Sequence, residues 1–200
     1  MTQLTTRSRL RRTGPAPPAR LIRKLAATEQ PLLAEHLLRL SPHDRSMRFM
    51  STVNDAHIVQ YTQRTDHQRL VLGYFVDGVM RGAGELIFLA NPAWRGACEA
   101  ALSVEPAWQH LGVGTELLQR LIVFARNRGA APLEIHFLRE NRRMQGLARK
   151  FGMTLAYDRS DVSAQLHPTW PNYLTLLGES FTDGHAFWAR WVESTQLARQ

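Results

Sequence analysis

Apolar and polar residues alternate along this chain with two periods, one typical of strands and one typical of helices. Short apolar runs predict strands at residues 21–25, 71–76, 79–89, 97–104, 132–138, 154–158 and 162–167. Apolar positions three and four residues apart predict helices beginning near residues 29, 42, 54 and 114, the first capped by Thr28. A further helix is expected between the strands at 132–138 and 154–158. This order predicts an α/β domain with a central mixed, twisted sheet and helices on both faces.

Residues 96–114 join a buried strand to a helix that begins in a glycine-rich sequence, Gln109-His110-Leu111-Gly112-Val113-Gly114. The first turn of a helix presents unpaired N–H groups and the positive end of the helix dipole. Because Gly112 and Gly114 lack Cβ atoms, the backbone there can close on a phosphate group. The pattern therefore predicts a pyrophosphate site, although it matches neither a P-loop nor a dinucleotide fold. On spacing alone, a helix start that merely carries two glycines stays an alternative.

Gln109-x-x-Gly112-x-Gly114 after an apolar strand resembles the acetyl-CoA pyrophosphate loop of the GNAT superfamily of N-acetyltransferases. A second block is similar to the family's next motif: strand 132–138, then residues 139–144 with Asn141, then residues 148–153 ending in Phe-Gly-Met. The closest resemblance is to the acetyltransferase domain of Pat-type bacterial protein lysine acetyltransferases. The strong match covers residues 98–153, and a weaker one extends back to Leu21.

This resemblance implies the GNAT fold and transfer of an acetyl group from acetyl-CoA to a primary amine, by direct attack in a ternary complex. The amine would belong to a protein lysine or to a small molecule, and no metal is implied. The strand backbone would bind the pantetheine, the glycine loop would bind the pyrophosphate, and Asn141 would hold the coenzyme from the second motif. The coenzyme-binding residues implied are Leu102, Ser103, Val104, Gln109, His110, Leu111, Gly112, Val113, Gly114, Thr115 and Asn141.

Glu99 is the candidate general base. Strand alternation places Glu99, Ala101 and Ser103 on one face, and a carboxylate in an apolar strand is costly to bury unless it is paired or protonated. A raised pKa suits a base that works near neutral pH, and Pat-type domains carry a glutamate at the matching position. The alternative is a structural glutamate paired with an arginine. Ala148 stands where many family members have a tyrosine that protonates the leaving thiolate, so the source of that proton stays open.

The ends of the chain differ in composition from its middle. Residues 1–20 hold five arginines and three prolines but no acidic residue, which predicts a disordered basic arm. Residues 21–168 form the expected acyltransferase domain, and residues 169–200 a helical extension docked on it, with Trp188 and Trp191 on one helical face. Cys98 is the single cysteine and no apolar run has the length of a membrane span, so the expected location is the cytoplasm without membrane association.

The formal net charge of +8 would attract a coenzyme with several phosphates, and it would equally attract nucleic acid. Because no nucleic-acid-binding motif accompanies the charge, nucleic-acid binding is not expected. A basic nucleic-acid binder remains one alternative function, and a non-catalytic acyl-CoA sensor or protein-interaction module on the same fold is another. The sequence predicts neither the identity of the acceptor nor the oligomeric state, for which a homodimer is one option.

Overall fold

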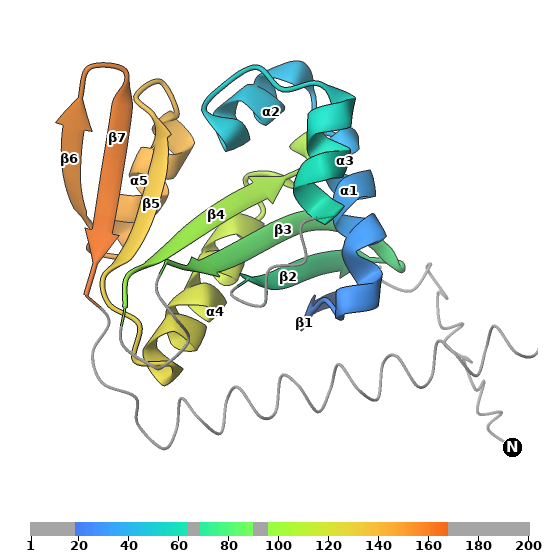
Figure 1. Ribbon diagram of the computed structural model, residues 1–200, viewed down its shortest axis with the longest axis horizontal. Coiled ribbons are helices and arrows are strands. Elements are labelled where there is room, and N and C mark those ends of the chain that lie inside the picture. The colour runs from blue at the N-terminus through green and yellow to red at the C-terminus, as the bar shows by residue number, and fades with distance from the viewer. Residues whose placement is uncertain (1–18, 64–68, 90–95, 168–200) are drawn as a thin grey trace, which may run out of the picture.

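The computed structural model describes residues 19–63, 69–89 and 96–167, shown in Figure 1. Most of the predicted basic arm and the whole predicted extension, with Trp188 and Trp191, lie outside these residues. Arg20, assigned to the arm, begins the first strand.

Five α-helices, two short 3₁₀ helices (η) and seven strands make up the described residues. In chain order they are β1 (Arg20–Lys24), η1 (Ala27–Glu29), α1 (Gln30–Leu38), α2 (Pro42–Phe49), α3 (Asp55–Gln63), β2 (Arg69–Val76), β3 (Val79–Phe88), β4 (Cys98–Val104), η2 (Pro106–Trp108), α4 (Val113–Asn127), β5 (Leu133–Leu138), α5 (Arg142–Lys150), β6 (Thr154–Asp158) and β7 (Asp161–Leu166). The strands form one sheet in the order β1-β2-β3-β4-β5-β7-β6. Only β4 and β5 are parallel neighbours. The predicted mixed sheet is confirmed.

Helices cover both faces of the sheet, as predicted (Figure 1). One apolar cluster joins α1 and α3 to β2 and β3, with Leu33, Leu37 and Ile58 fully buried. A second, larger cluster joins α4 and α5 to the opposite face of the strands, with Leu117 and Leu121 at its centre. Leu121 lies so close to β3 that a Cβ on Gly84 would come within 3.2 Å of its side chain.

The start of α1 differs from the prediction. Thr28 does not cap the helix, because it lies inside η1, and α1 begins at Gln30 with no side-chain cap. The Glu29 carboxylate instead accepts a hydrogen bond from the Ala26 N–H at 2.7 Å and pairs with Arg23 at 2.8 Å. A charged acceptor bound to a buried guanidinium outcompetes a neutral hydroxyl at this turn.

The parallel strands β4 and β5 separate soon after they meet. Their register pairs only Cys98 with Leu133 and Glu99 with Glu134, whereas β3 pairs with β4 along its whole length to Val104. The Cys98 N–H donates to the Pro132 carbonyl on the β5 side at 2.9 Å. Because backbone groups alternate sides along a strand, those of Ala100, Leu102 and Val104 also face the β5 side. β4 therefore presents an edge without a β5 partner inside the sheet.

The Cys98 thiol is sealed in the core, and this burial has a measurable consequence. It has 0% exposure, and burial together with the Glu134 carboxylate raises its pKa from 9.0 to about 12. Since only the thiolate reacts, labelling by Ellman's reagent at pH 8 should be at least about a thousandfold slower in the folded protein than in guanidinium chloride. Rapid labelling of the folded protein would contradict this packing.

Candidate active site

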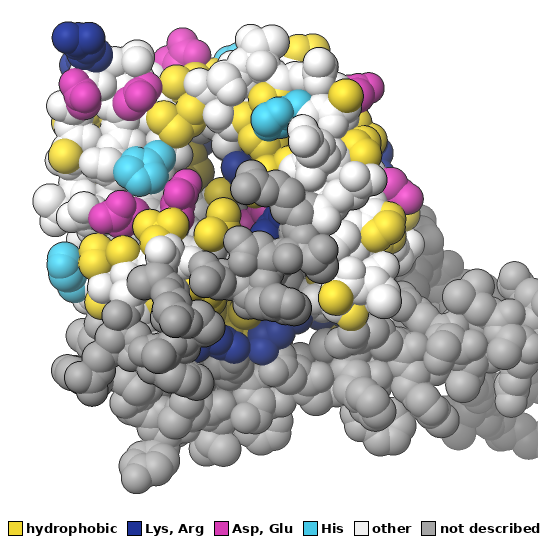
Figure 2. Space-filling model, viewed as in Figure 1, with side chains coloured by type: hydrophobic (Ala, Val, Ile, Leu, Met, Phe, Trp, Pro, Cys, Tyr) yellow, Lys and Arg dark blue, Asp and Glu magenta, His cyan; other side chains and the backbone are white. Residues whose placement is uncertain are grey.

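A cavity of about 510 Å³ opens where β4 and β5 separate. Figure 2 shows one face of the molecule, and Lys and Arg side chains are visible inside the hollow near the centre of that face. The walls of the cavity come from α2 and the residue Leu40 before it, from β4, from the glycine loop and the start of α4, from β5, and from α5 with its N-cap. The lining residues are Leu40, Asp44, Met47, Arg48, Ala101–Val104, Gln109, His110, residues 112–115, Ile135–Phe137, Asn141, Arg143, Met144, Gly146, Leu147 and Lys150. Of the predicted coenzyme residues, all but Leu111 line it. Leu111 is 55% exposed and points away from this lining.

The glycine loop brings the open end of α4 to the cavity. His110 and Gly112 both have positive φ angles, 60° and 84°, and Gly112 is the N-cap residue without a side-chain cap. The first helical bond runs from the Glu116 N–H to the Gly112 carbonyl, so the N–H groups of residues 113–115 have no partner within the helix. No atom lies within 4 Å of where a Cβ of Gly112 would stand. This arrangement can bind an anion.

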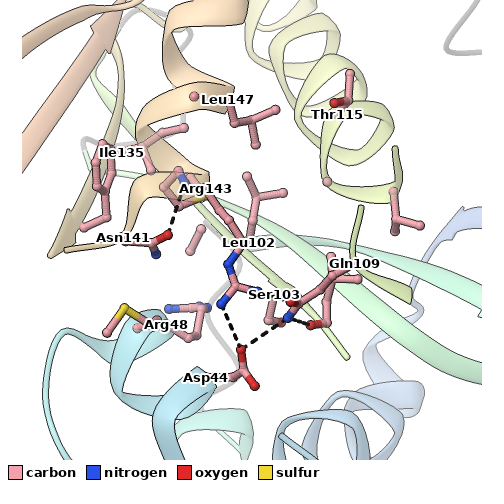
Figure 3. Close-up of a pocket in the computed structure, with 18 of the residues that line it drawn as sticks. Asp44, Arg48, Leu102, Ser103, Gln109, Thr115, Ile135, Asn141, Arg143 and Leu147 are labelled. Carbon is pink, nitrogen blue, oxygen red and sulfur yellow. Dashed lines mark hydrogen bonds and ion pairs between the residues drawn. The ribbon is translucent and has the colours of Figure 1, made fainter. Parts of the chain in front are cut away.

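A polar bridge spans the cavity at this end (Figure 3). The Gln109 Nε2 donates to the Val104 carbonyl at 2.9 Å and to Asp44 Oδ1 at 3.2 Å, while Arg143 donates to Gln109 Oε1. Arg143 Nη2 also lies 3.7 Å from Asp44 Oδ1. Asp44 is held in turn by the Ser41 hydroxyl at 2.5 Å. The bridge connects α2, the glycine loop and α5, three segments far apart in the sequence.

Asn141 is the N-cap of α5. Its Oδ1 accepts a hydrogen bond from the Met144 N–H at 3.1 Å, while its Nδ2 has no partner among the described residues. The side chain therefore begins the helix and presents a donor at the cavity wall, where the sequence predicted a coenzyme contact.

Glu99 does not line the cavity. It lies at the start of β4, half-buried, with Cα partners Ile87 on β3 and Glu134 on β5. Strand alternation places it on the same face as Ala101 and Ser103, which do line the cavity. Within the described part of the chain, Glu99 neither enters the cavity wall nor pairs with an arginine, so its role as a base stays a prediction.

Sequence reasoning missed a fully buried carboxylate, Glu85, beside the cavity. It accepts hydrogen bonds from Arg48 at 2.5 Å and from the Tyr61 hydroxyl at 2.9 Å, and it also pairs with Arg69. Burial raises the pKa of Glu85, but the charges of Arg48 and Arg69 outweigh burial and leave that pKa below its ordinary value. An acidic residue in the apolar run of β3 was the available signal, but its partners come from α2, α3 and β2.

A second buried polar cluster underlies the end of β4. The His36 ring lies between the Ser103 hydroxyl, 2.9 Å from Nε2, and Glu105 Oε1, 3.4 Å from Nδ1. Glu105 also accepts from Arg39 at 2.8 Å and from Arg81 at 2.9 Å. Burial raises the pKa of Glu105, but the hydrogen bonds from these three partners outweigh it and lower that pKa to about 2. The cluster ties α1 to the sheet under the cavity.

Two expected absences can be stated for the described residues. They include no group of three or more His, Cys, Asp or Glu side chains that could hold a metal ion. No helix in residues 19–63, 69–89 and 96–167 is both long and apolar enough to cross a membrane.

An open β4 edge beside a glycine-rich helix start, in a sheet of this order, defines the class of acyl-CoA-dependent acetyltransferases. The model of the Acetyltransferase (GNAT) family matches residues 33–153, more than half of the chain, so the chain belongs to the GNAT family. Acetyltransferase PA5475 of Pseudomonas aeruginosa is 27% identical over 152 residues, which are 74% of this chain and 81% of that protein.

Solved structures share the fold at low identity. The GNAT domain of S. lividans PAT superposes with a TM-score of 0.63 at 18% identity, covering 75% of this chain and 96% of that one. YncA from Salmonella typhimurium, solved with acetyl-CoA, gives 0.55 at 20% identity over 76% and 95% of the two chains. PaiA from Thermoplasma acidophilum, solved with coenzyme A, gives 0.56 at 20% identity over 74% and 99%.

Replacing Glu85 by glutamine should destabilise the fold strongly. The change leaves the buried guanidinium groups of Arg48 and Arg69 without a counter-charge, which costs about 3–5 kcal/mol in the free energy of unfolding. Urea unfolding at pH 7 measures this loss. The same change at Glu116, which is about half exposed and pairs with Arg120 one helical turn away, should cost less than about 1 kcal/mol.

The effect of the Glu85 change should also depend on pH. The folded-state pKa of Glu85 lies below the ordinary pKa of a glutamate. Ionised Glu85 therefore stabilises the fold at pH values above that ordinary pKa, and this stabilisation is lost as the pH falls through the lowered, folded-state pKa. The difference in unfolding free energy between wild type and Glu85→Gln should therefore shrink on acidification below the ordinary pKa of a glutamate. A difference that is small at pH 7 would contradict an ionised, paired Glu85.

Proposed function

We propose that this chain is an acetyl-CoA-dependent N-acetyltransferase that transfers the acetyl group to a primary amine. The observation that carries the proposal is the convergence of three features in one cavity. These are the unpaired N–H groups of residues 113–115, the open edge of β4, and the cationic side chains of Arg143 and Lys150. Acetyl-CoA in YncA and coenzyme A in PaiA, two structures with the same fold, support it.

The residues present fit this co-substrate. The N–H groups of residues 113–115, with positive φ at Gly112, suit the pyrophosphate. The N–H and C=O of Leu102 and the N–H of Val104 suit the amides of the pantetheine arm, which would then add to β4 like a strand. Asn141 Nδ2 is a further donor on the α5 side. Gln109 stays a proposed coenzyme residue, and its side chain, which bridges the cavity, would also hold the loop.

The chemistry follows from direct attack. A primary amine is largely an ammonium ion at neutral pH, so it must give up a proton before a nitrogen lone pair can attack the thioester carbonyl. Glu99 is the proposed base that takes this proton, acting through water from beside Ala101. The C–N bond forms, the C–S bond breaks and coenzyme A leaves as the thiolate. Ala148 is fully buried in the core, so no side chain at that position can protonate the thiolate. With a thiol pKa of about 8.5, the thiolate can leave without a dedicated acid.

The finer assignments belong to the same proposal. A Pat-like relationship rests on the sequence resemblance, and with it a protein lysine as one acceptor class, with a small-molecule amine as the other. Residues 21–168 would form the catalytic domain, working in the cytoplasm. The arm and the extension would flank this domain.

Gly112→Asp should weaken the binding of acetyl-CoA at least about tenfold, because a side chain and a negative charge would occupy the space proposed for the pyrophosphate. Gly78→Asp is the matched control: Gly78 also has a positive φ, 76°, and open space around a Cβ, but it lies in the β2–β3 turn. Both variants lose conformational freedom, so calorimetric titration should show weaker binding only for Gly112→Asp. Equal affinity in the two variants would remove the pyrophosphate assignment.

Glu99→Gln should keep the affinity for acetyl-CoA and lower kcat at least about a hundredfold, since the base would be lost. Glu134→Gln provides the control, because Glu134 is the Cα partner of Glu99 on the neighbouring strand. Thiol release with an acceptor amine measures both rates. If kcat of Glu99→Gln matches that of the wild type at every pH, Glu99 is not the base.

A further inference from the structure

Arg48 forms part of the cavity wall at the α2 end of the cavity. In Figure 3 it lies beside Asp44 and Ser103, across the cavity from Thr115 and Leu147. With the pyrophosphate at residues 113–115 and the pantetheine along β4, this end is the space that remains for the acceptor. Arg48 is the side chain there whose hydrogen-bonding capacity is only partly used.

The guanidinium group of Arg48 has one nitrogen to offer. Its Nη2 donates to Glu85 and to the Tyr61 hydroxyl, and its Nε is sealed from solvent without a partner. Nη1 has no partner among the described residues and is not sealed, so it is the nitrogen that can reach the cavity. The group lies against the rings of Phe49 and Tyr61, which pack edge to face, with its carbon 4.9 Å and 5.6 Å from their centres. Its orientation is therefore set before any ligand arrives.

The charge around Arg48 is not balanced. Two buried arginines, Arg48 and Arg69, share the single carboxylate of Glu85, which leaves one net positive charge against the cavity wall. The Asp44 carboxylate already faces another cation, because Arg143 Nη2 lies 3.7 Å from Asp44 Oδ1. A positive charge removed from water is costly unless an anion joins it.

We propose that the acceptor is a small primary amine that also carries a carboxylate, as a free amino acid does, and that Arg48 Nη1 binds this carboxylate. The inference rests on the proposed function and chooses between its two acceptor classes. A guanidinium N–H and a carboxylate oxygen form a strong, directional hydrogen bond. The amine of a protein lysine has no anionic group of its own beside it, so it would leave Arg48 uncompensated.

The test compares paired acceptors with the full-length protein and acetyl-CoA. Free amino acids are assayed against their carboxamides, which keep the amine and the side chain but lack the negative charge, by thiol release and by mass of the product. The wild type should prefer at least one free acid by about 10- to 100-fold in kcat/KM. The preference should reside in KM, because Arg48 binds the acceptor and does not touch the reacting atoms.

Arg48→Gln and Arg69→Gln form a matched pair. Each variant leaves Glu85 with one arginine, but Arg69 does not line the cavity. Arg48→Gln should lose the preference for the acid and keep its rate on the carboxamide, whereas Arg69→Gln should keep the preference. Thermal unfolding checks that both variants fold, and the wild-type comparison stands without them if they do not.

Several results would overturn the inference. Equal kcat/KM for acids and carboxamides would do so, as would an equal loss of preference in both variants or acetylation of protein lysines alone. Calorimetric titration of the wild type with acetyl-CoA separates the two proposals. If acetyl-CoA binds and an amine without a carboxylate is acetylated while no free amino acid is, only the carboxylate site is wrong. If acetyl-CoA does not bind, the proposed function fails and the acceptor site fails with it.

Discussion

The separation of β4 from β5 is the constraint on which the rest of the structure depends. A parallel pair that stops after two residues leaves backbone N–H and C=O groups of β4 without a strand partner in the middle of a sheet. Buried polar groups of this kind need another partner, and a ligand with amide groups can supply one. The edge therefore explains both why a cavity exists and what chemistry suits it.

Other elements hold the gap open. Side-chain contacts among Gln109, Asp44 and Arg143 connect the glycine loop, α2 and α5. The segments that follow the two diverging strands are therefore linked to each other. Under the cavity, Glu85 and Glu105 each collect charged partners and fix α1 and α2 against the sheet. Four arginines, Arg39, Arg48, Arg69 and Arg81, bind these two carboxylates. Part of the basic charge is therefore structural.

The strands and helices were predictable because each has a clear apolar period, and the glycine loop because few sequences place two glycines at a helix start. Thr28 failed as a cap since the Glu29 carboxylate is the stronger acceptor at this turn, a competition that spacing does not reveal. Arg48 and Glu85 lie 37 residues apart in the sequence, and His36 and Ser103 lie 67 residues apart. Patterns among neighbouring residues cannot predict such contacts. Leu111 was included in the loop by position; it is 55% exposed and does not line the cavity, and its contact with the coenzyme stays a prediction.

The central claim is that the open edge of β4 and the first turn of α4 bind one molecule of acetyl-CoA. Site-resolved amide hydrogen exchange with and without acetyl-CoA tests it most directly, since it reports on the backbone groups themselves. The account predicts slower exchange at Leu102, Val104 and residues 113–115, with little change in the β2–β3 hairpin around Gly78. Unchanged exchange at both sites with saturating acetyl-CoA, or protection confined to other segments, would contradict it.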